Sequence, residues 1–137
     1  MANKTFRLVI LTPYGRYFDG QVEFLEVHSE DYNLGILPGH TPLISTLIVS
    51  KMVIKMNGKS FNYAIGGGAI NIEKDLVTLI LNSVEREDEI DVDRAEQAKT
   101  RAEQRLKDAN KENEIDTNRA KLAYARAINR LKIALKD

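Results

Sequence analysis

Residues 52–64 read MVIKMNGKSFNYA and contain the clearest short-range structural signal in the chain. Two runs rich in β-favouring residues, 52–56 and 60–64, flank the pair Asn57-Gly58. Asn-Gly favours the left-handed backbone of a two-residue hairpin turn. Gly58-Lys59-Ser60 also resembles the end of a phosphate-binding loop, but that loop needs a glycine at position 53, where the chain has Val53. The stretch therefore predicts a β-hairpin rather than a nucleotide-binding loop.

Further strands are predicted on both sides of this hairpin. Residues 6–11 alternate with a strand period, 22–27 are rich in β-favouring residues, and 76–81 form an apolar run. The triple glycine at 66–68 lacks the spacing of a dinucleotide fingerprint, because Asn71 stands at the third glycine's place. It predicts a bulge or a close backbone approach. Short strands separated by turn signals predict a small sandwich or barrel.

The composition of the chain changes at Val84. All eight glycines and all three prolines lie before this residue, whereas nine of the twelve alanines lie after it. Residues 85–137 also carry 26 of the charged side chains, thirteen of each sign. Such a shift marks a boundary between two kinds of structure. We predict a β-sandwich over residues 1–84 and a helical hairpin over 85–137.

Alanine and leucine recur at helical spacing along two segments of the second part. The first set is Ala95, Ala98, Ala102, Leu106 and Ala109, and the second is Ala120, Ala123, Ala127, Leu131 and Ala134. The polar run 110–113 is predicted to be the turn between two helices, and Asp116 to cap the second. The predicted fold class is α+β: an N-terminal antiparallel β-sandwich followed by a C-terminal antiparallel two-helix hairpin.

The predicted helix seam is weak, and charge is ordered along it. Alanines allow a close approach but bury little apolar area, so we expect a hairpin that can open. The alternative is a rigid hairpin docked permanently on the sheet. Residues 85–93 hold six acids and one base, whereas 117–137 hold six bases and one acid. Both clusters suit the helix dipole, and in an antiparallel hairpin these two ends lie side by side.

Several classes of function are excluded by composition and spacing. The formal net charge is zero, with no basic patch interleaved with aromatics, so a nucleic-acid binder is not expected. The absence of cysteine excludes disulfides and thiolate chemistry. The longest uncharged run, 34–50, contains Gly, Pro and His and is not a membrane span, and the N-terminus does not read as a signal peptide. His28 and His40 have no second ligand at metal spacing, so no metal is predicted, and no catalytic constellation is present.

One cluster of residues points to a ligand. The predicted hairpin brings together Arg94 and Arg101 from the first helix, and Arg126 and Arg130 from the second. Pairs four or seven residues apart share a helix face, so the four guanidinium groups are expected to converge beside the seam. Glu96 and Glu103 neutralising them is one interpretation. A bound polyphosphate is the other, because arginine forks bind phosphate oxygens in bidentate fashion.

Three segments resemble the ε subunit family of bacterial F-type ATP synthases. They are GILPGHTPL at 35–43, the Gly67-Gly68 strand, and IDVDRA at 90–95, and they occur in the family's order along the whole chain. The resemblance implies a non-catalytic subunit whose sandwich sits on the central rotor stalk, touching the γ subunit and the ring of c subunits. It also implies a mobile hairpin that enters the head of α and β subunits and inhibits ATP hydrolysis. The implied location is peripheral, at the cytoplasmic face of the cell membrane.

The same resemblance implies two sets of site residues. Some members of the family bind ATP as a regulatory ligand without hydrolysing it. The matching positions here are Glu85, Ile90, Asp91, Arg94, Ala95, Arg101, Arg126 and Arg130. The c-ring contact maps to the turn at 29–33, with Ser29, Glu30, Asp31 and Asn33, and to His40. For His40, a hydrogen bond that stabilises its own turn is the alternative.

Two other readings of the whole chain remain open at this point. The first is a free-standing β-sandwich adaptor that uses its helices to pair with a partner coiled coil. The second is a nucleotide sensor that acts alone. A rotor subunit must travel with a membrane-bound ATPase, whereas an adaptor need not.

Overall fold

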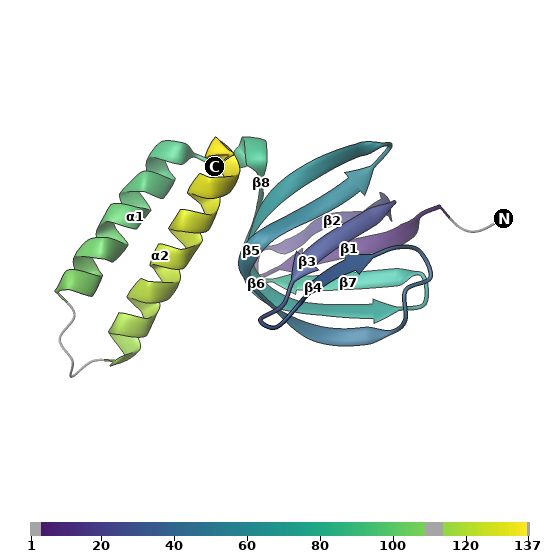
Figure 1. Ribbon diagram of the computed structural model, residues 1–137, viewed down its shortest axis with the longest axis horizontal. Coiled ribbons are helices and arrows are strands. Elements are labelled where there is room, and N and C mark those ends of the chain that lie inside the picture. Colours follow the sequence, from purple (N-terminus) through teal and green to yellow (C-terminus); the bar gives the residue numbers. More distant parts are fainter. Residues whose placement is uncertain (1–3, 109–113, 137) are drawn as a thin grey trace. The chain divides into compact units, whose positions relative to one another are not determined.

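The computed structural model describes residues 4–108 and 114–136. The chain divides into two compact units, Met1–Arg86 and Glu87–Asp137. The sequence-predicted boundary after Val84 is two residues too early, because Val84 opens the last strand of the first unit. Figure 1 traces both units along the sequence.

The described part of the first unit contains eight strands. They are β1 (Phe6–Thr12), β2 (Gly15–Val22), β3 (Phe24–His28), β4 (Asn33–Ile36), β5 (Leu43–Met56), β6 (Lys59–Glu73), β7 (Leu76–Leu81) and β8 (Val84–Arg86). The order along the sheet is β2-β1-β7-β6-β5-β3-β4, and β8 also pairs with β6. The predicted strands at 6–11, 52–56, 60–64 and 76–81 are confirmed, and the 22–27 stretch spans the end of β2 and most of β3. The structure adds β4 and extends β2, β5 and β6 well beyond the predicted runs.

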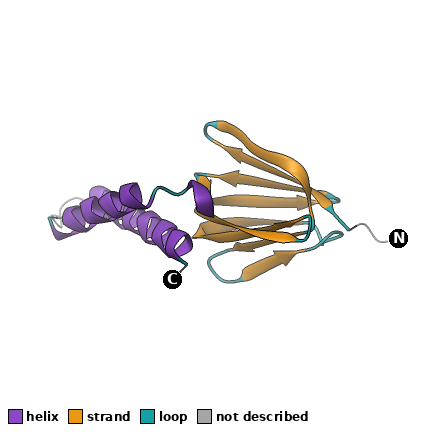
Figure 2. Ribbon diagram, turned by 90° about the horizontal axis from the view of Figure 1, so that it is seen from above, coloured by secondary structure: helices purple, strands orange, loops and turns teal. Residues whose placement is uncertain are grey.

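The long hairpin β5–β6 joins the two layers of a sandwich. The second part of β6 pairs with β7, whereas its first part pairs with β8. In the same way, β3 pairs only with the last third of β5. One layer is therefore β2-β1-β7 with the adjoining ends of β6 and β5, and the other is β8, β3 and β4 with the remaining parts of β6 and β5. Figure 2 draws these strands in orange and the helices in purple. Large apolar side chains fill the space between the layers, among them Leu8, Ile10, Met52, Ile54 and Leu79.

The sandwich is mostly, but not entirely, antiparallel. Strand β1 pairs with β7 in parallel, with Leu8 beside Val77 and Ile10 beside Leu79. All the other strand pairs are antiparallel. A parallel pair needs a long crossover, and here the whole chain between β1 and β7 supplies it. The predicted β-sandwich is confirmed, and among the described strands the β1–β7 pair is its one departure from antiparallel pairing.

Local backbone chemistry explains both glycine predictions. Asn57 and Gly58 have φ angles of 51° and 76°, as a type I′ turn requires, and Met56 pairs with Lys59 across them. In β6, Gly67 and Gly68 have φ angles of 89° and 152°. An added Cβ on Gly68 would lie 2.0 Å from the backbone oxygen of Ile80. The hairpin and the close backbone approach are both confirmed.

In its described ranges, 87–108 and 114–136, the second unit contains a short helical turn and two long helices. The 3-10 turn η1 spans Glu87–Glu89, α1 spans Val92–Lys107 and α2 spans Glu114–Leu135. The helices pack against each other as a hairpin (Figure 1). The predicted turn at 110–113 lies outside the described residues. Asp116 is not the cap of α2, because the helix already includes Glu114, so Asp116 lies within the first turn.

Candidate functional site

The start of α1 is held by an aspartate cap. Asp91 has an extended backbone, with φ −84° and ψ 102°, and its Oδ1 accepts a hydrogen bond of 3.1 Å from the backbone N–H of Arg94. The Asp91 carbonyl also accepts from the N–H of Ala95 at 3.0 Å. These bonds satisfy amides at a helix start and fix where the Arg94 side chain leaves the helix. Ile90 and Ala95, on either side of this cap, are buried.

The helix seam consists of small residues. Ala95 and Ala102 on α1 are buried, as are Ala120 and Ala127 on α2. The other described members of the predicted seam, Ala98, Leu106, Ala123, Leu131 and Ala134, are partly buried. Ala109 lies outside the described residues. The predicted alanine seam is therefore confirmed over its described length, and it is joined by Ile133, which the spacing argument did not include.

The arginines of the predicted cluster differ in their surroundings. Arg94 and Arg101 on α1 are exposed, and Arg101 lines an open groove with Asp93, Glu96, Gln97 and Thr100. On α2, Arg126 and Arg130 are partly buried. The Nε of Arg126 is buried and has no hydrogen-bond partner among the described residues. An unsatisfied buried donor costs free energy, so this atom fits a site where an acceptor is expected to bind.

The carboxylates expected to neutralise the arginines make other contacts. In the part of the chain that the structure describes, Glu103 forms its ion pair with Lys99, at 3.9 Å. The backbone carbonyl of Glu96 accepts a hydrogen bond from the Thr100 hydroxyl. Among the described residues, Glu96 and Glu103 therefore form no ion pair with the four arginines of the predicted cluster.

An ion pair links the two ends of the second unit. Lys136, just after α2, lies 3.6 Å from Glu87 in η1. This contact confirms that the acidic start and the basic end of the hairpin lie side by side. Both side chains are solvent-accessible, and surface ion pairs contribute about 0–1 kcal/mol. This ion pair therefore contributes little to holding the two ends of the hairpin together.

Glu85 belongs to the other unit. It is the middle residue of β8 and is paired with Ala64 of β6. Its side chain is partly buried and lines a cavity of about 390 Å³ together with residues of the β1–β2 hairpin, including Tyr14, Arg16 and Tyr17. Of the eight residues implied in ATP binding, it is the one carried by the sandwich.

The residues implied in the c-ring contact flank the edge strand β4. Ser29 is buried and closes the turn before β4: its N–H donates to the Tyr32 carbonyl at 2.9 Å, and its Oγ accepts from the Asp31 N–H at 3.4 Å. Glu30, Asp31 and Asn33 are exposed. His40 follows the other end of β4, and its Nδ1 lies 2.6 Å from the Thr41 carbonyl oxygen. The structure thus places Ser29 as a turn residue and shows the local hydrogen bond considered for His40.

The sandwich also has an outward face that sequence reasoning did not single out. Directly paired residues point the same way, so Leu11, Ile80 and Ala69 share this face across three strands. Ile80 is 59% exposed. Ile44 of β5 pairs with Asn71 of β6, which lies on the same face, and it is 77% exposed. The sequence pattern did not reveal this face, because apolar residues stand at both inward and outward positions of β1, β5 and β7.

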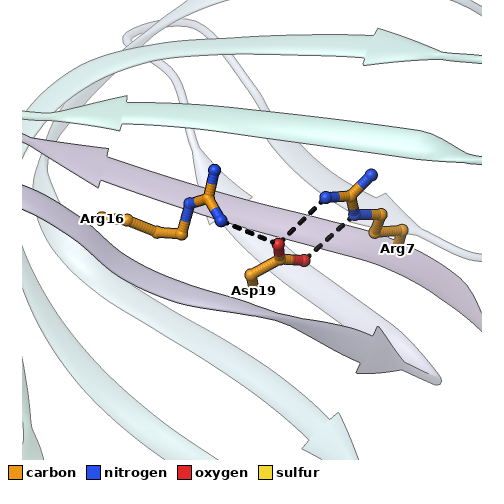
Figure 3. Close-up of polar contacts among 3 residues, drawn as sticks. All are labelled: Arg7, Arg16 and Asp19. Atoms are coloured by element: carbon orange, nitrogen blue, oxygen red, sulfur yellow. Dashed lines mark hydrogen bonds and ion pairs between the residues drawn. The ribbon is translucent and has the colours of Figure 1, made fainter.

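A salt-bridge cluster borders the same face (Figure 3). Arg7 donates from Nε and Nη2 to the two carboxylate oxygens of Asp19, at 3.0 and 2.9 Å, and Arg16 donates at 3.3 Å. The hydrogen bonds from Arg7, with the charges of both arginines, lower the pKa of Asp19. The same hydrogen bonds raise the pKa of Arg7. This border therefore stays charged, so the face combines exposed isoleucines with a fixed polar rim.

No described helix is long and apolar enough to cross a membrane. Within the described ranges, no group of three or more acidic or histidine side chains is placed to hold a metal ion.

A β-sandwich linked to a separate, arginine-bearing helical hairpin defines a two-module class of protein, and comparisons with known proteins identify its family. The model of the β-sandwich domain of the ATP synthase delta/epsilon chain matches residues 5–87, and the model of its long alpha-helix domain matches residues 88–134. The chain therefore belongs to the ATP synthase delta/epsilon chain family, and it is a subunit of that type.

Individual relatives agree with this assignment. The chain is 45% identical over 106 residues to an ATP synthase epsilon chain of Pelotomaculum thermopropionicum, covering 77% of this chain and 79% of the relative. It is 42% identical over 105 residues to one from Bacillus thuringiensis, with the same coverage of both chains.

Two solved structures share the fold. A chain in the Euglena gracilis mitochondrial ATP synthase has a TM-score of 0.81 at 17% identity, with 98% of this chain and 84% of that chain covered. A chain in the Tetrahymena thermophila mitochondrial ATP synthase central stalk and c-ring has a TM-score of 0.60 at 13% identity, with 98% and 99% covered. At these identities the likeness concerns the fold.

Proposed function

We propose that this chain is a non-catalytic rotor-stalk subunit whose helical hairpin binds ATP as a regulatory ligand. The observation that carries the proposal is the buried Nε of Arg126, which has no hydrogen-bond partner among the described residues. A phosphate oxygen is the acceptor that suits it best, because arginine binds phosphate through charge-assisted hydrogen bonds.

The rest of the hairpin supplies the other groups such a ligand needs. Arg130 stands one helical turn after Arg126, and the packed partner helix carries Arg94 and Arg101. The Asp91 cap fixes the backbone from which Arg94 extends. If these guanidinium groups gather around one ligand, they repel one another unless anions lie between them, and a polyphosphate is such an anion. As the family resemblance implies, we expect ATP to be bound and not hydrolysed.

A calorimetric titration of the intact chain with ATP tests this proposal. We expect saturable binding of one ATP, with ADP binding more weakly because it has fewer phosphate oxygens. Binding to the closed hairpin stabilises it by RT ln(1 + [ATP]/Kd), which is about 2.7 kcal/mol at a hundred times Kd. An absence of heat at millimolar ATP, in protein whose helices are intact by circular dichroism, contradicts ATP binding.

The proposed regulation rests on the weak closure of the hairpin. Its seam is alanine-rich, and in the Glu87–Lys136 pair Lys136 is exposed and Glu87 partly buried. Opening exposes the segment 117–137, with a net charge of +5 from six bases and one acid. Long-range attraction to an acidic surface speeds docking of such a helix. We therefore propose that the opened helix inhibits hydrolysis by docking in the head of α and β subunits, whereas ATP keeps it closed.

The sandwich is proposed to hold the chain on the rotor. Its outward face, with Ile44, Ile80 and Leu11, is the candidate surface for the γ subunit, because exposed isoleucines beside a polar rim are typical of an interface. The edge strand β4 and its flanking turns are the candidate surface for the c-ring. These contacts would place the chain peripherally at the cytoplasmic face of the membrane, through the complex.

Deleting residues 117–137 is expected to raise ATP hydrolysis by the assembled complex, provided that the intact complex is inhibited. The shortened chain keeps the whole sandwich, so it should still co-purify with the γ subunit. Unchanged hydrolysis would contradict inhibition by this helix. Loss of the γ subunit from the preparation would instead contradict the assignment of rotor binding to the sandwich.

A further inference from the structure

The tip of the β5–β6 hairpin is clamped by a carboxylate from another strand junction. Glu23 lies between β2 and β3, and its Oε1 accepts a hydrogen bond of 2.7 Å from the backbone N–H of Gly58. Its own backbone N–H donates to the Lys55 carbonyl at 2.7 Å. Glu23 is therefore anchored to the hairpin at two points, and its side chain holds the peptide plane that joins Asn57 to Gly58.

Asn57 and Gly58 are also the chemically most labile pair in the chain. This is the one Asn-Gly step in the sequence, and both residues are exposed. An added Cβ on Gly58 would meet nothing within 4 Å, so no neighbouring group crowds that side of the turn. Asparagine followed by glycine undergoes spontaneous deamidation readily, because glycine offers no side chain to hinder attack by its own backbone nitrogen.

We propose that Asn57 is a site of spontaneous deamidation and that Glu23 slows the reaction. The deprotonated backbone nitrogen of Gly58 attacks Cγ of Asn57, a C–N bond forms, and the side-chain amide leaves as ammonia after taking up a proton. Water then opens the resulting five-membered succinimide at one carbonyl or the other, which gives aspartate or isoaspartate at position 57. Water is the only co-reactant, and no oxidant or reductant is needed.

Glu23 opposes this reaction in two ways. Attack requires rotation of the Asn57–Gly58 peptide plane, and the 2.7 Å hydrogen bond holds that plane in the type I′ turn. Attack also requires loss of the Gly58 amide proton, and an adjacent negative charge disfavours an amide anion. A hydrogen bond to a charged acceptor is strong enough to change an opening equilibrium by about tenfold or more.

The products would alter the hairpin. Aspartate at position 57 adds a carboxylate close to that of Glu23, and like charges repel. Isoaspartate inserts an extra methylene into the backbone, which a two-residue turn between paired Met56 and Lys59 does not accommodate. Either product is expected to loosen the tip of the hairpin and its contact with the β2–β3 junction.

Incubation of the full chain at 37 °C and mildly alkaline pH, followed by peptide mapping, tests this proposal. Mass spectrometry should locate deamidation at position 57, at a rate about tenfold below that of a synthetic peptide of residues 52–64. Glu23→Ala should raise the rate to near that of the peptide, and Glu23→Gln, which keeps an uncharged acceptor, should give an intermediate rate. Glu26→Ala is the matched control and should leave the rate unchanged, because Gly58 bonds Glu23 and not Glu26.

The possible outcomes separate the two parts of the proposal. A signal that persists in Asn57→Gln shows that the modified residue was misassigned. A rate in Glu23→Ala at or below that of the unmodified chain overturns the protective role, since it would mean that the carboxylate acts as a base. If Glu23→Ala does not fold, as judged by loss of the circular dichroism of the sandwich, Glu23→Gln replaces it as the test. A deamidation rate in Glu23→Gln no higher than that of the unmodified chain then overturns the proposal.

Discussion

Arg126→Ala is expected to weaken ATP binding by about tenfold to a hundredfold. Hydrogen bonds to charged groups contribute about 1.5–3 kcal/mol, which corresponds to that range of affinity. The same substitution is expected to leave the free protein no less stable, because it removes a buried donor that has no partner among the described residues. Calorimetry gives the affinity, and thermal unfolding with and without ATP gives the two stabilities.

Two further variants make the result specific to the buried guanidinium group. Arg119→Ala removes an exposed arginine from the same helix and is expected to change ATP affinity little. Arg126→Lys keeps the charge but loses the planar fork, so it should restore only part of the affinity. The opposite pattern, in which Arg126→Ala lowers thermal stability equally with and without ATP, would show that Arg126 is structural.

The parts of the fold that depend on neighbouring residues were predictable from sequence. The Asn57-Gly58 turn follows from its local preference for positive φ, and the alanine seam follows from its helical spacing. The parallel pairing of β1 with β7 was not predictable, because the two strands are separated in the sequence by most of the sandwich. Strand β4 was missed because it is only four residues long and contains Gly35.

In the candidate site, too, local sequence predicted some features, whereas others depend on tertiary packing. Helical spacing placed Arg126 and Arg130 on one face, but the burial of the Arg126 Nε depends on how the surrounding side chains pack. Ile133 was missed because it does not continue the alanine spacing. Asp116 was assigned as the cap because aspartate favours that position, yet α2 already includes Glu114.

Gly68→Ala is expected to destabilise the sandwich by about 3 kcal/mol or more, since a strained φ alone costs about 1–3 kcal/mol. At Gly68 the added Cβ would also lie 2.0 Å from the Ile80 oxygen and 2.9 Å from the Leu81 Cα. These are backbone atoms of the paired strand β7, so no side-chain rotation relieves the clash, and β6 and β7 must separate where they pair.

Gly39→Ala is the matched control for this effect. Gly39 also has a positive φ, of 82°, but an added Cβ there meets nothing within 4 Å. It should therefore show the cost of strain without the clash, about 1 kcal/mol. Urea unfolding followed by tyrosine fluorescence measures both, because Tyr14, Tyr17, Tyr32 and Tyr63 lie in the sandwich and only Tyr124 lies in the helices. Equal unfolding midpoints for the two variants would show that β6 and β7 do not need glycine at their closest approach.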